Sequence, residues 1–187
     1  MMRFTYPRFR LRTLLGLFAV ASVALAVYGT AWRSRERQYA VAVELAQLGI
    51  RARSQSLPRW GLRPEIDYVE IDEHLGLKSN GLNWAVVPRP PEQKLTSADV
   101  ARLAAFPALR KLHLQGNVIE PAAIAEIAKL TSLEELVVVH FPLNDEQFLS
   151  LGKLTHLRDL TLEATEVTDG AIDRLREQLP DLQVYDD

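Results

Sequence analysis

The chain has 187 residues, a length that allows one domain of ordinary size with additional segments. It contains no cysteine, which excludes disulfide bonds, thiolate metal sites and a cysteine nucleophile. Its net charge of −2 is uneven: residues 1–53 hold nine arginines against two glutamates (+7), whereas residues 54–187 hold 13 basic against 22 acidic residues (−9). Because nucleic-acid binding needs a basic surface, the acidic part argues against a nucleic-acid partner.

An apolar segment follows a basic N-terminal tail at residues 1–12. Residues 13–32 are uncharged, and a helix of about 20 residues spans the roughly 30 Å of a hydrocarbon core. We therefore predict a transmembrane helix that anchors the chain in a cell membrane. The short tail and the acidic remainder favour a single-pass protein with its C-terminal domain on the outer, periplasmic or extracytoplasmic, side. The alternative is a signal peptide cleaved after Ala26, which would make the protein secreted.

The next segments are predicted from local composition. Residues 33–51 read as a juxtamembrane helix that ends near Gly49. Residues 52–65 contain two prolines and a glycine and read as a linker. Two short strands are expected further on, at Ile66–Ile71 and at Trp84–Val87.

The second half of the chain repeats itself every 24 residues. Leu109–Leu114, Leu133–Val138 and Leu157–Leu162 share apolar residues at their first, fourth and sixth positions. Within each segment the residues alternate as in a strand, and apolar residues then recur at helical spacing. A fixed period of this length is typical of a solenoid.

The last repeat continues with Thr165-Glu-Val167-Thr168-Asp169, a T-x-V-T-D turn. This pattern resembles the leucine-rich repeat family, in particular its short bacterial form. The resemblance implies an α/β fold: a leucine-rich repeat solenoid of about three coils plus caps, here behind the transmembrane helix. Residues 95–187 would form the repeat domain and residues 66–94 its N-terminal cap. It also implies a binding scaffold whose partners usually bind the strand face.

Two helix starts carry the pattern of a capping box. These are Thr96-x-x-Asp99, a shortened variant, and Asn144-x-x-Gln147. In a capping box the side chain of the first residue accepts a hydrogen bond from the backbone N–H of the fourth residue. The side chain of the fourth residue accepts a second hydrogen bond from the backbone N–H of the first. We therefore expect helices to begin after Thr96 and after Asn144.

The alternation in the strands predicts which side chains point outward. Val137 and Val139 are apolar at positions where water is expected; single exposed valines are normal in strands, but these two could also centre a protein interface with a charged rim. We predict a binding face made of the nine outward residues Lys111, His113, Gln115, Glu135, Val137, Val139, Asp159, Thr161 and Glu163.

Few residues are candidates for chemistry. The four histidines share no metal-ligand spacing, so we expect no metal and no other cofactor. Glu135 and Asp159 occupy one register, but Lys111 precedes them in it, which indicates a charge ladder. Neither a nucleophile–base pair nor a phosphate loop is present, so no small-molecule substrate is expected. The sequence thus predicts a membrane-anchored, non-catalytic protein–protein interaction module with an unidentified protein partner. The alternatives are a secreted leucine-rich repeat binding protein and, less favoured, an enzyme.

Overall fold

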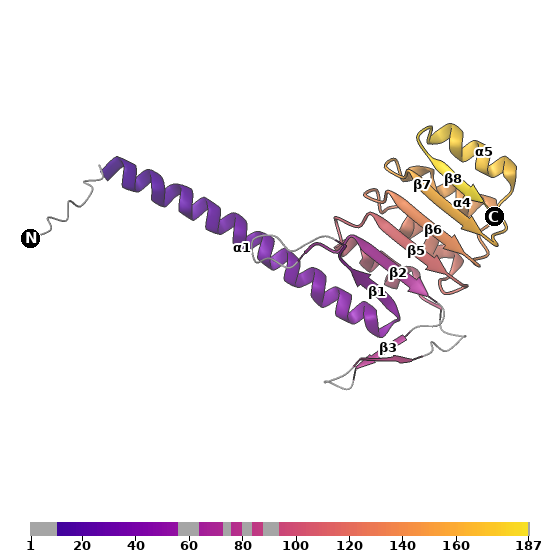
Figure 1. The fold of residues 1–187 in the computed structure, drawn as a ribbon, viewed down its shortest axis with the longest axis horizontal. Coiled ribbons are helices and arrows are strands. Elements are labelled where there is room, and N and C mark those ends of the chain that lie inside the picture. Colours follow the sequence, from indigo (N-terminus) through magenta and orange to yellow (C-terminus); the bar gives the residue numbers. More distant parts are fainter. Residues whose placement is uncertain (1–10, 56–63, 73–75, 80–83, 88–93, 187) are drawn as a thin grey trace, which may run out of the picture.

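The structure, a computed structural model of the whole chain, describes residues 11–55, 64–72, 76–79, 84–87 and 94–186. Side chains are described for residues 18–55, 64–71 and 94–186. The described chain begins with one long helix, α1 (Leu11–Gln47), and continues into a sheet that carries helices on one face (Figure 1).

Six strands form the main sheet in the order β1-β2-β5-β6-β7-β8. Their bounds are β1 (Ile50–Arg53), β2 (Tyr68–Asp72), β5 (Lys111–Gln115), β6 (Glu135–Val139), β7 (Asp159–Glu163) and β8 (Gln183–Asp186). All neighbours are parallel except β1, which runs antiparallel to β2. A separate antiparallel hairpin joins β3 (Gly76–Ser79) to β4 (Trp84–Val87). The strands predicted near Ile66–Ile71 and at Trp84–Val87 are therefore confirmed as β2 and β4.

Short helices connect the parallel strands and lie behind the sheet in the view of Figure 1. They are α2 (Ser97–Ala101), η1 (Arg102–Ala105), η2 (Pro121–Ala123), α3 (Ile124–Ile127), α4 (Asp145–Ser150), η3 (Leu151–Lys153) and α5 (Asp169–Gln178), where η marks a 3₁₀ helix. Both predicted capping boxes are confirmed: α2 follows Thr96, and α4 follows Asn144. Each box satisfies backbone N–H groups that a helix start leaves without partners.

The core lies between the sheet and these helices. Leu112, Leu136 and Leu160 occupy matching positions on β5, β6 and β7, and none of them is more than 1% exposed. They belong to one buried cluster that also contains Ile127 and Leu151 from the helix layer. Because strand side chains alternate between faces, burial of these leucines directs the residues between them to the opposite face.

A left-handed residue ends each of the three central strands. Gly116, His140 and Ala164 follow β5, β6 and β7, and their φ angles are 80°, 53° and 50°. The N–H of Gly116 donates to the carbonyl oxygen of Val139, and that of His140 donates to Glu163. These two turns therefore link the ends of β5 and β6 to the next strand. Of the three left-handed residues, only Gly116 has the residue type that adopts this conformation without steric cost.

The C-terminal part of α1 packs against the first end of the sheet. Leu45 in α1 and Ile50 in β1 are both fully buried in the core cluster. Glu44 pairs with Arg102 of η1, and Arg35 pairs with Glu65 ahead of β2. The N-terminal part of α1 extends away from the sheet (Figure 1). Residues 50–53 were divided between the predicted helix and the predicted linker, and the structure instead makes them a strand.

The structure corrects the predicted fold class. The expected leucine-rich repeat solenoid behind a transmembrane helix is wrong: the described residues form a long helix followed by a six-stranded, mostly parallel α/β sheet. A solenoid adds equivalent turns in one direction. Here β1 runs antiparallel, and Tyr68 of β2 pairs with Lys111, far more than one 24-residue repeat away. The repeat thus accounts for only part of the sheet.

The predicted transmembrane helix at residues 13–32 is also corrected. Within the described part of the chain, no helix combines the length and the apolar composition needed to cross a membrane. The helix that contains this segment continues without a break to Gln47, through charged residues that begin at Arg33.

Candidate binding face

The face of the main sheet opposite the helices, called the open face below, carries all nine residues of the predicted site. They come from β5, β6 and β7 in three rows that run across the strands. The rows are Lys111, Glu135 and Asp159; His113, Val137 and Thr161; and Gln115, Val139 and Glu163. Eight of the nine side chains are half-buried, and Glu163 is exposed. The nine side chains therefore share one surface of the sheet.

An ion pair occupies the first row. The Nζ of Lys111 lies 2.5 Å from Oε2 of Glu135 on the neighbouring strand. The hydrogen bond and the negative charge of Glu135 raise the pKa of Lys111 above its ordinary value of 10.5. Asp159, the next residue in the row, adds a smaller effect of the same sign. Lys111 therefore neutralises Glu135, and Asp159 contributes the excess negative charge of the row.

The middle row is less polar. Val137 and Thr161 lie side by side on β6 and β7, and Val139 lies two residues further along β6. On the other side of Val137 stands His113, whose Nε2 is inaccessible to solvent and has no hydrogen-bond partner among the described residues. Val137 and Val139 therefore form a half-buried apolar pair near the His113 ring, and such apolar surface favours contact with another apolar group over contact with water.

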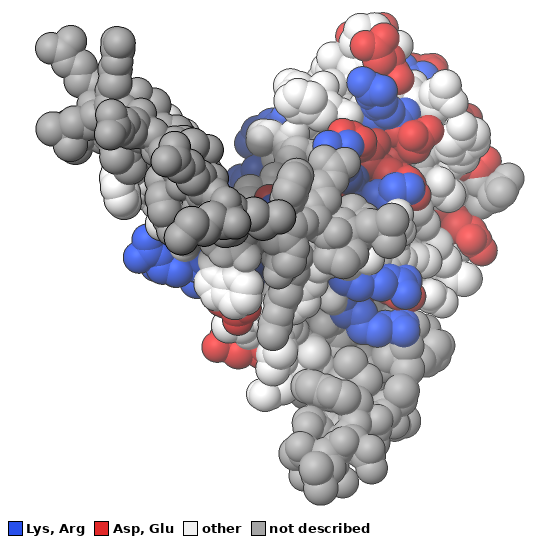
Figure 2. Space-filling model, turned by 60° about the vertical axis from the view of Figure 1, so that its left-hand side comes forward, with Lys and Arg blue, Asp and Glu red and all other residues white. Residues whose placement is uncertain are grey.

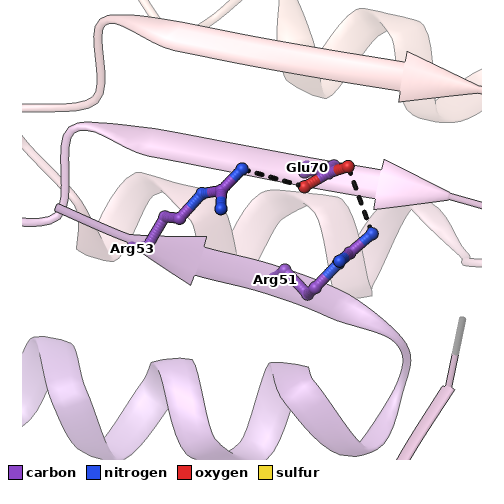
Figure 3. Close-up of polar contacts among 3 residues, drawn as sticks. All are labelled: Arg51, Arg53 and Glu70. Carbon is purple, nitrogen blue, oxygen red and sulfur yellow. Dashed lines mark hydrogen bonds and ion pairs between the residues drawn. The ribbon is translucent and has the colours of Figure 1, made fainter. Parts of the chain in front are cut away.

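A polar cluster that the sequence analysis missed extends the open face beyond β5. It consists of Arg51 and Arg53 on β1 and Glu70 on β2 (Figure 3). The guanidinium groups of Arg51 and Arg53 donate to separate oxygens of Glu70, at 3.1 Å and 3.2 Å. The Arg53 guanidinium carbon also lies 4.5 Å from the centre of the Tyr68 ring, a cation–π contact. We call Arg51, Arg53 and Glu70 the arginine fork.

The signal for the arginine fork was present in the sequence but short. Ile50-Arg-Ala-Arg53 alternates apolar and charged residues with the period of a strand. In β2, Glu70 likewise stands between two buried apolar residues. Antiparallel pairing places Arg51 directly opposite Glu70. Glu70 in turn lies beside His113 of the predicted site, so the arginine fork and the nine residues form one continuous surface.

Charged residues lie at both ends of the open face. In the arginine fork two guanidinium groups share one carboxylate. Lys111 and Glu135 cancel, whereas Asp159 and Glu163 on β7 add two negative charges. On the right-hand side of Figure 2 the acidic atoms gather in the upper half, toward the end that carries β8 and α5. The open face therefore has an apolar part at β6 beside an acidic part at β7.

The other histidines with described side chains lie away from the middle row of the open face. His140 and His156 are exposed and follow β6 and η3, away from the middle row. Nδ1 of His156 lies 2.9 Å from the carbonyl oxygen of Thr131. Among the described residues, no group of three or more histidine, aspartate and glutamate side chains could hold a metal ion. The geometry thus offers charge complementarity and an apolar contact rather than a ligand set.

In comparisons with known proteins, no family model matches this sequence and no curated protein matches it. Membership of the leucine-rich repeat family therefore stays a prediction that depends on the repeated residues alone. Function has to be inferred from the open face itself.

Proposed function

We propose that the chain is a non-catalytic protein-binding module and that the open face is its binding surface. The observation that carries this proposal is the position of Val137 and Val139. They lie half-buried at the centre of a rigid sheet, inside a rim of charged side chains. Protein interfaces are built in this way, with an apolar centre that excludes water and a polar rim that selects the partner.

The pairing of the rim charges supports binding rather than catalysis. Lys111 is engaged by Glu135, and Glu70 is engaged by two arginines. These ion pairs hold the charged groups at defined positions on the open face. Fixed charges at defined positions suit the recognition of a complementary surface.

The helix side provides a contrast within the same molecule. Glu126 and Lys129 of the α3 region pair with each other at 2.7 Å on the solvent-facing side of the helices. Exposed pairs of this kind on one helix contribute little to binding or stability. They therefore offer a control surface away from the open face.

The test replaces the apolar centre and follows the partner. Cross-linking of the full-length protein in its own cells, followed by mass spectrometry, identifies the protein that it binds. The double variant Val137→Asp/Val139→Asp should lose this partner, because it places two charges in the apolar centre of the open face. Circular dichroism has to show that the variant is folded.

Two further variants sharpen this test. Val137→Thr/Val139→Thr keeps the branched shape and adds no charge, so it should weaken capture while preserving the strand. Glu126→Gln/Lys129→Gln should capture the same partner as the wild type. If the folded double aspartate variant still captures that partner, the open face is not the binding surface.

A further inference from the structure

The outer edge of β8 is an unpaired end of the main sheet. β8 comes last in the strand order, at the end of the sheet farthest from α1 (Figure 1), and within the described part of the chain no strand pairs with its outer side. We propose that this edge pairs with β8 of a second copy of the chain, antiparallel and with Tyr185 opposite itself, to form a symmetric dimer with one continuous sheet. This inference goes beyond the proposed function and does not depend on it.

The backbone of β8 offers two residues to such a partner. The N–H of Gln183 donates to the carbonyl oxygen of Arg158, next to the start of β7, at 2.7 Å, so the backbone groups of Gln183 point toward β7. These groups alternate in direction along a strand, so those of Tyr185 also point toward β7, whereas those of Val184 and Asp186 point outward. Two such edges in antiparallel contact can therefore exchange hydrogen bonds between Val184 of each copy and Asp186 of the other.

The bounds of β8 fix the register of this pairing. With Tyr185 opposite itself, the contact uses residues 184–186, which all lie within the strand. A shift that placed Val184 opposite itself would bring in Leu182, which precedes the strand and whose N–H already donates to the carbonyl oxygen of Leu179 at 3.0 Å. A shift that placed Asp186 opposite itself would set two carboxylates side by side, which is destabilising.

Tyr185 supplies the apolar contact at the centre of the dimer. It is 52% exposed, and among the described side chains outside α1 no other large hydrophobic one is as exposed. It pairs with Thr161 of β7, so its side chain extends the middle row of the open face. In an antiparallel pair, opposite residues whose hydrogen bonds point away from each other come closest, so the two rings meet on the two-fold axis as a stabilising aromatic pair. The hydroxyl group already donates to Oε1 of Gln183 at 2.7 Å, so covering the ring leaves this group with a partner.

Arg176 gives the edge a charge that suits a second copy. Val184 and Asp186 face the helix side of the sheet, because their partners on β7 are buried leucines. On that side α5 carries the exposed Arg176, whose guanidinium donates to the outward carbonyl oxygen of Val184 at 3.4 Å. In the dimer, Asp186 of the second copy lies opposite Val184, which brings its carboxylate beside this guanidinium. A second copy thus adds an arginine–aspartate pair on each side of the two-fold axis.

The dimer joins the two open faces. Its two-fold axis runs perpendicular to the sheet, so both open faces lie on the same side. Val137 of one copy then lies about 24 Å from Val137 of the other, over five strand intervals of about 4.8 Å. A partner with two binding segments can therefore occupy both apolar centres at once, which raises its overall affinity.

The absence of cysteine allows a direct test in the full-length chain. Tyr185→Cys places two thiols opposite each other at the two-fold axis, within the Cα separation of about 4.4–6.8 Å that a disulfide needs. Oxidation with copper phenanthroline should therefore give a covalent dimer on non-reducing electrophoresis. Gln183→Cys is the matched control, on the same face of the same strand. Its two thiols stand on opposite sides of the axis, about 14 Å apart, and should not cross-link.

Sedimentation velocity tests the backbone and charge contacts. The wild-type chain should form a dimer, and Asp186→Pro should weaken it roughly ten-fold or more, because proline removes the outward N–H in each copy but no hydrogen bond to β7. Circular dichroism has to show that this variant is folded. Arg176→Gln should weaken the dimer about two- to five-fold, as expected for exposed ion pairs. Arg174→Gln removes the same charge from the same helix, near Asp145 of α4, and should leave the dimer unchanged.

Several outcomes would overturn this inference: a monomeric wild type, no cross-link in Tyr185→Cys, an equal cross-link in Gln183→Cys, or tighter association of Arg176→Gln. A dimer that persists unchanged in folded Asp186→Pro would mean that another surface associates, which also contradicts the β8 contact. None of these results bears on the proposed function, which is decided by whether Val137→Asp/Val139→Asp loses the cellular partner.

Discussion

The burial pattern of β6 gives a sharp prediction for two adjacent residues. Leu136 is 1% exposed and lies between Leu112 and Leu160 on the neighbouring strands. Its neighbour Val137 is half-buried on the open face. Replacement of either residue by alanine removes apolar atoms from the same strand, but the lost contacts lie on opposite faces of the sheet.

Leu136→Ala should be strongly destabilising. The substitution removes methyl groups from a site packed on both sides, and the rigid strands cannot close the cavity. Loss of transfer free energy together with the cavity term amounts to about 2–5 kcal/mol for a buried leucine. A domain of this size has about 5–15 kcal/mol of stability in total, so a large fraction should be lost.

Val137→Ala should cost below about 1 kcal/mol, because the side chain is only half-buried and the change affects strand propensity and part of its burial. The assay is urea unfolding of the full-length protein followed by circular dichroism, with the slope of the transition compared between variants. Equal losses for Leu136→Ala and Val137→Ala, at unchanged slope, would refute the strand register described here.

Three further predictions concern strand ends and helix starts. Asn144→Ala should lower the free energy of unfolding by about 1 kcal/mol in urea, because it removes the acceptor for the N–H of Gln147; no loss would mean that the capping box does not stabilise α4. Hydrogen bonds from the backbone N–H and hydroxyl of Thr168 lower the pKa of Asp145 below 3.8, so this carboxylate stabilises the fold above that pH and the contribution is lost as the pH falls through the lowered pKa. Asp145→Asn should therefore destabilise the protein at pH 7 and lose this effect as the pH falls through the lowered pKa of Asp145, in contrast to Glu146→Gln in the same turn; a pH-independent effect would contradict this. Ala164→Gly should raise the free energy of unfolding by up to about 1 kcal/mol, because it relieves a φ of 50°, whereas Ala104→Gly, at a residue without positive φ, should lower it by roughly 0.5–1 kcal/mol. A loss for both glycine variants would show that the left-handed turn carries no steric cost.

The sequence predicted the central strands and their register because two independent patterns agree there. Alternation within Leu133–Val138 places Leu136 inward, and the 24-residue repeat places Leu112 and Leu160 beside it. An error of one residue would have turned every apolar side chain to solvent. The capping boxes at Thr96 and Asn144 were predictable for a similar reason, because both partners lie within four residues.

The fold class was not predictable from the repeat, since the repeat says nothing about the segments that precede it. The strand β1 has only four residues, too few for alternation to be distinguished from the end of a helix. Its partner β2 lies beyond residues 54–67, and pairing over such a distance leaves no local mark in either segment. The helix predicted from residue 33 to near Gly49 is present as the C-terminal part of α1, but the transmembrane assignment of residues 13–32 was wrong.

The same limit applies to the candidate site. A repeat presents equivalent positions on successive strands, so Lys111, Glu135 and Asp159 could be placed in one row from their spacing alone. The arginine fork comes from a strand outside the repeat and from an antiparallel pairing. The open face therefore combines two kinds of sequence: the repeat supplies the apolar centre and the acidic end, and β1 supplies the two arginines. Removal of Arg53 should accordingly leave the register of β5, β6 and β7 unchanged, because no backbone hydrogen bond of those strands depends on that side chain.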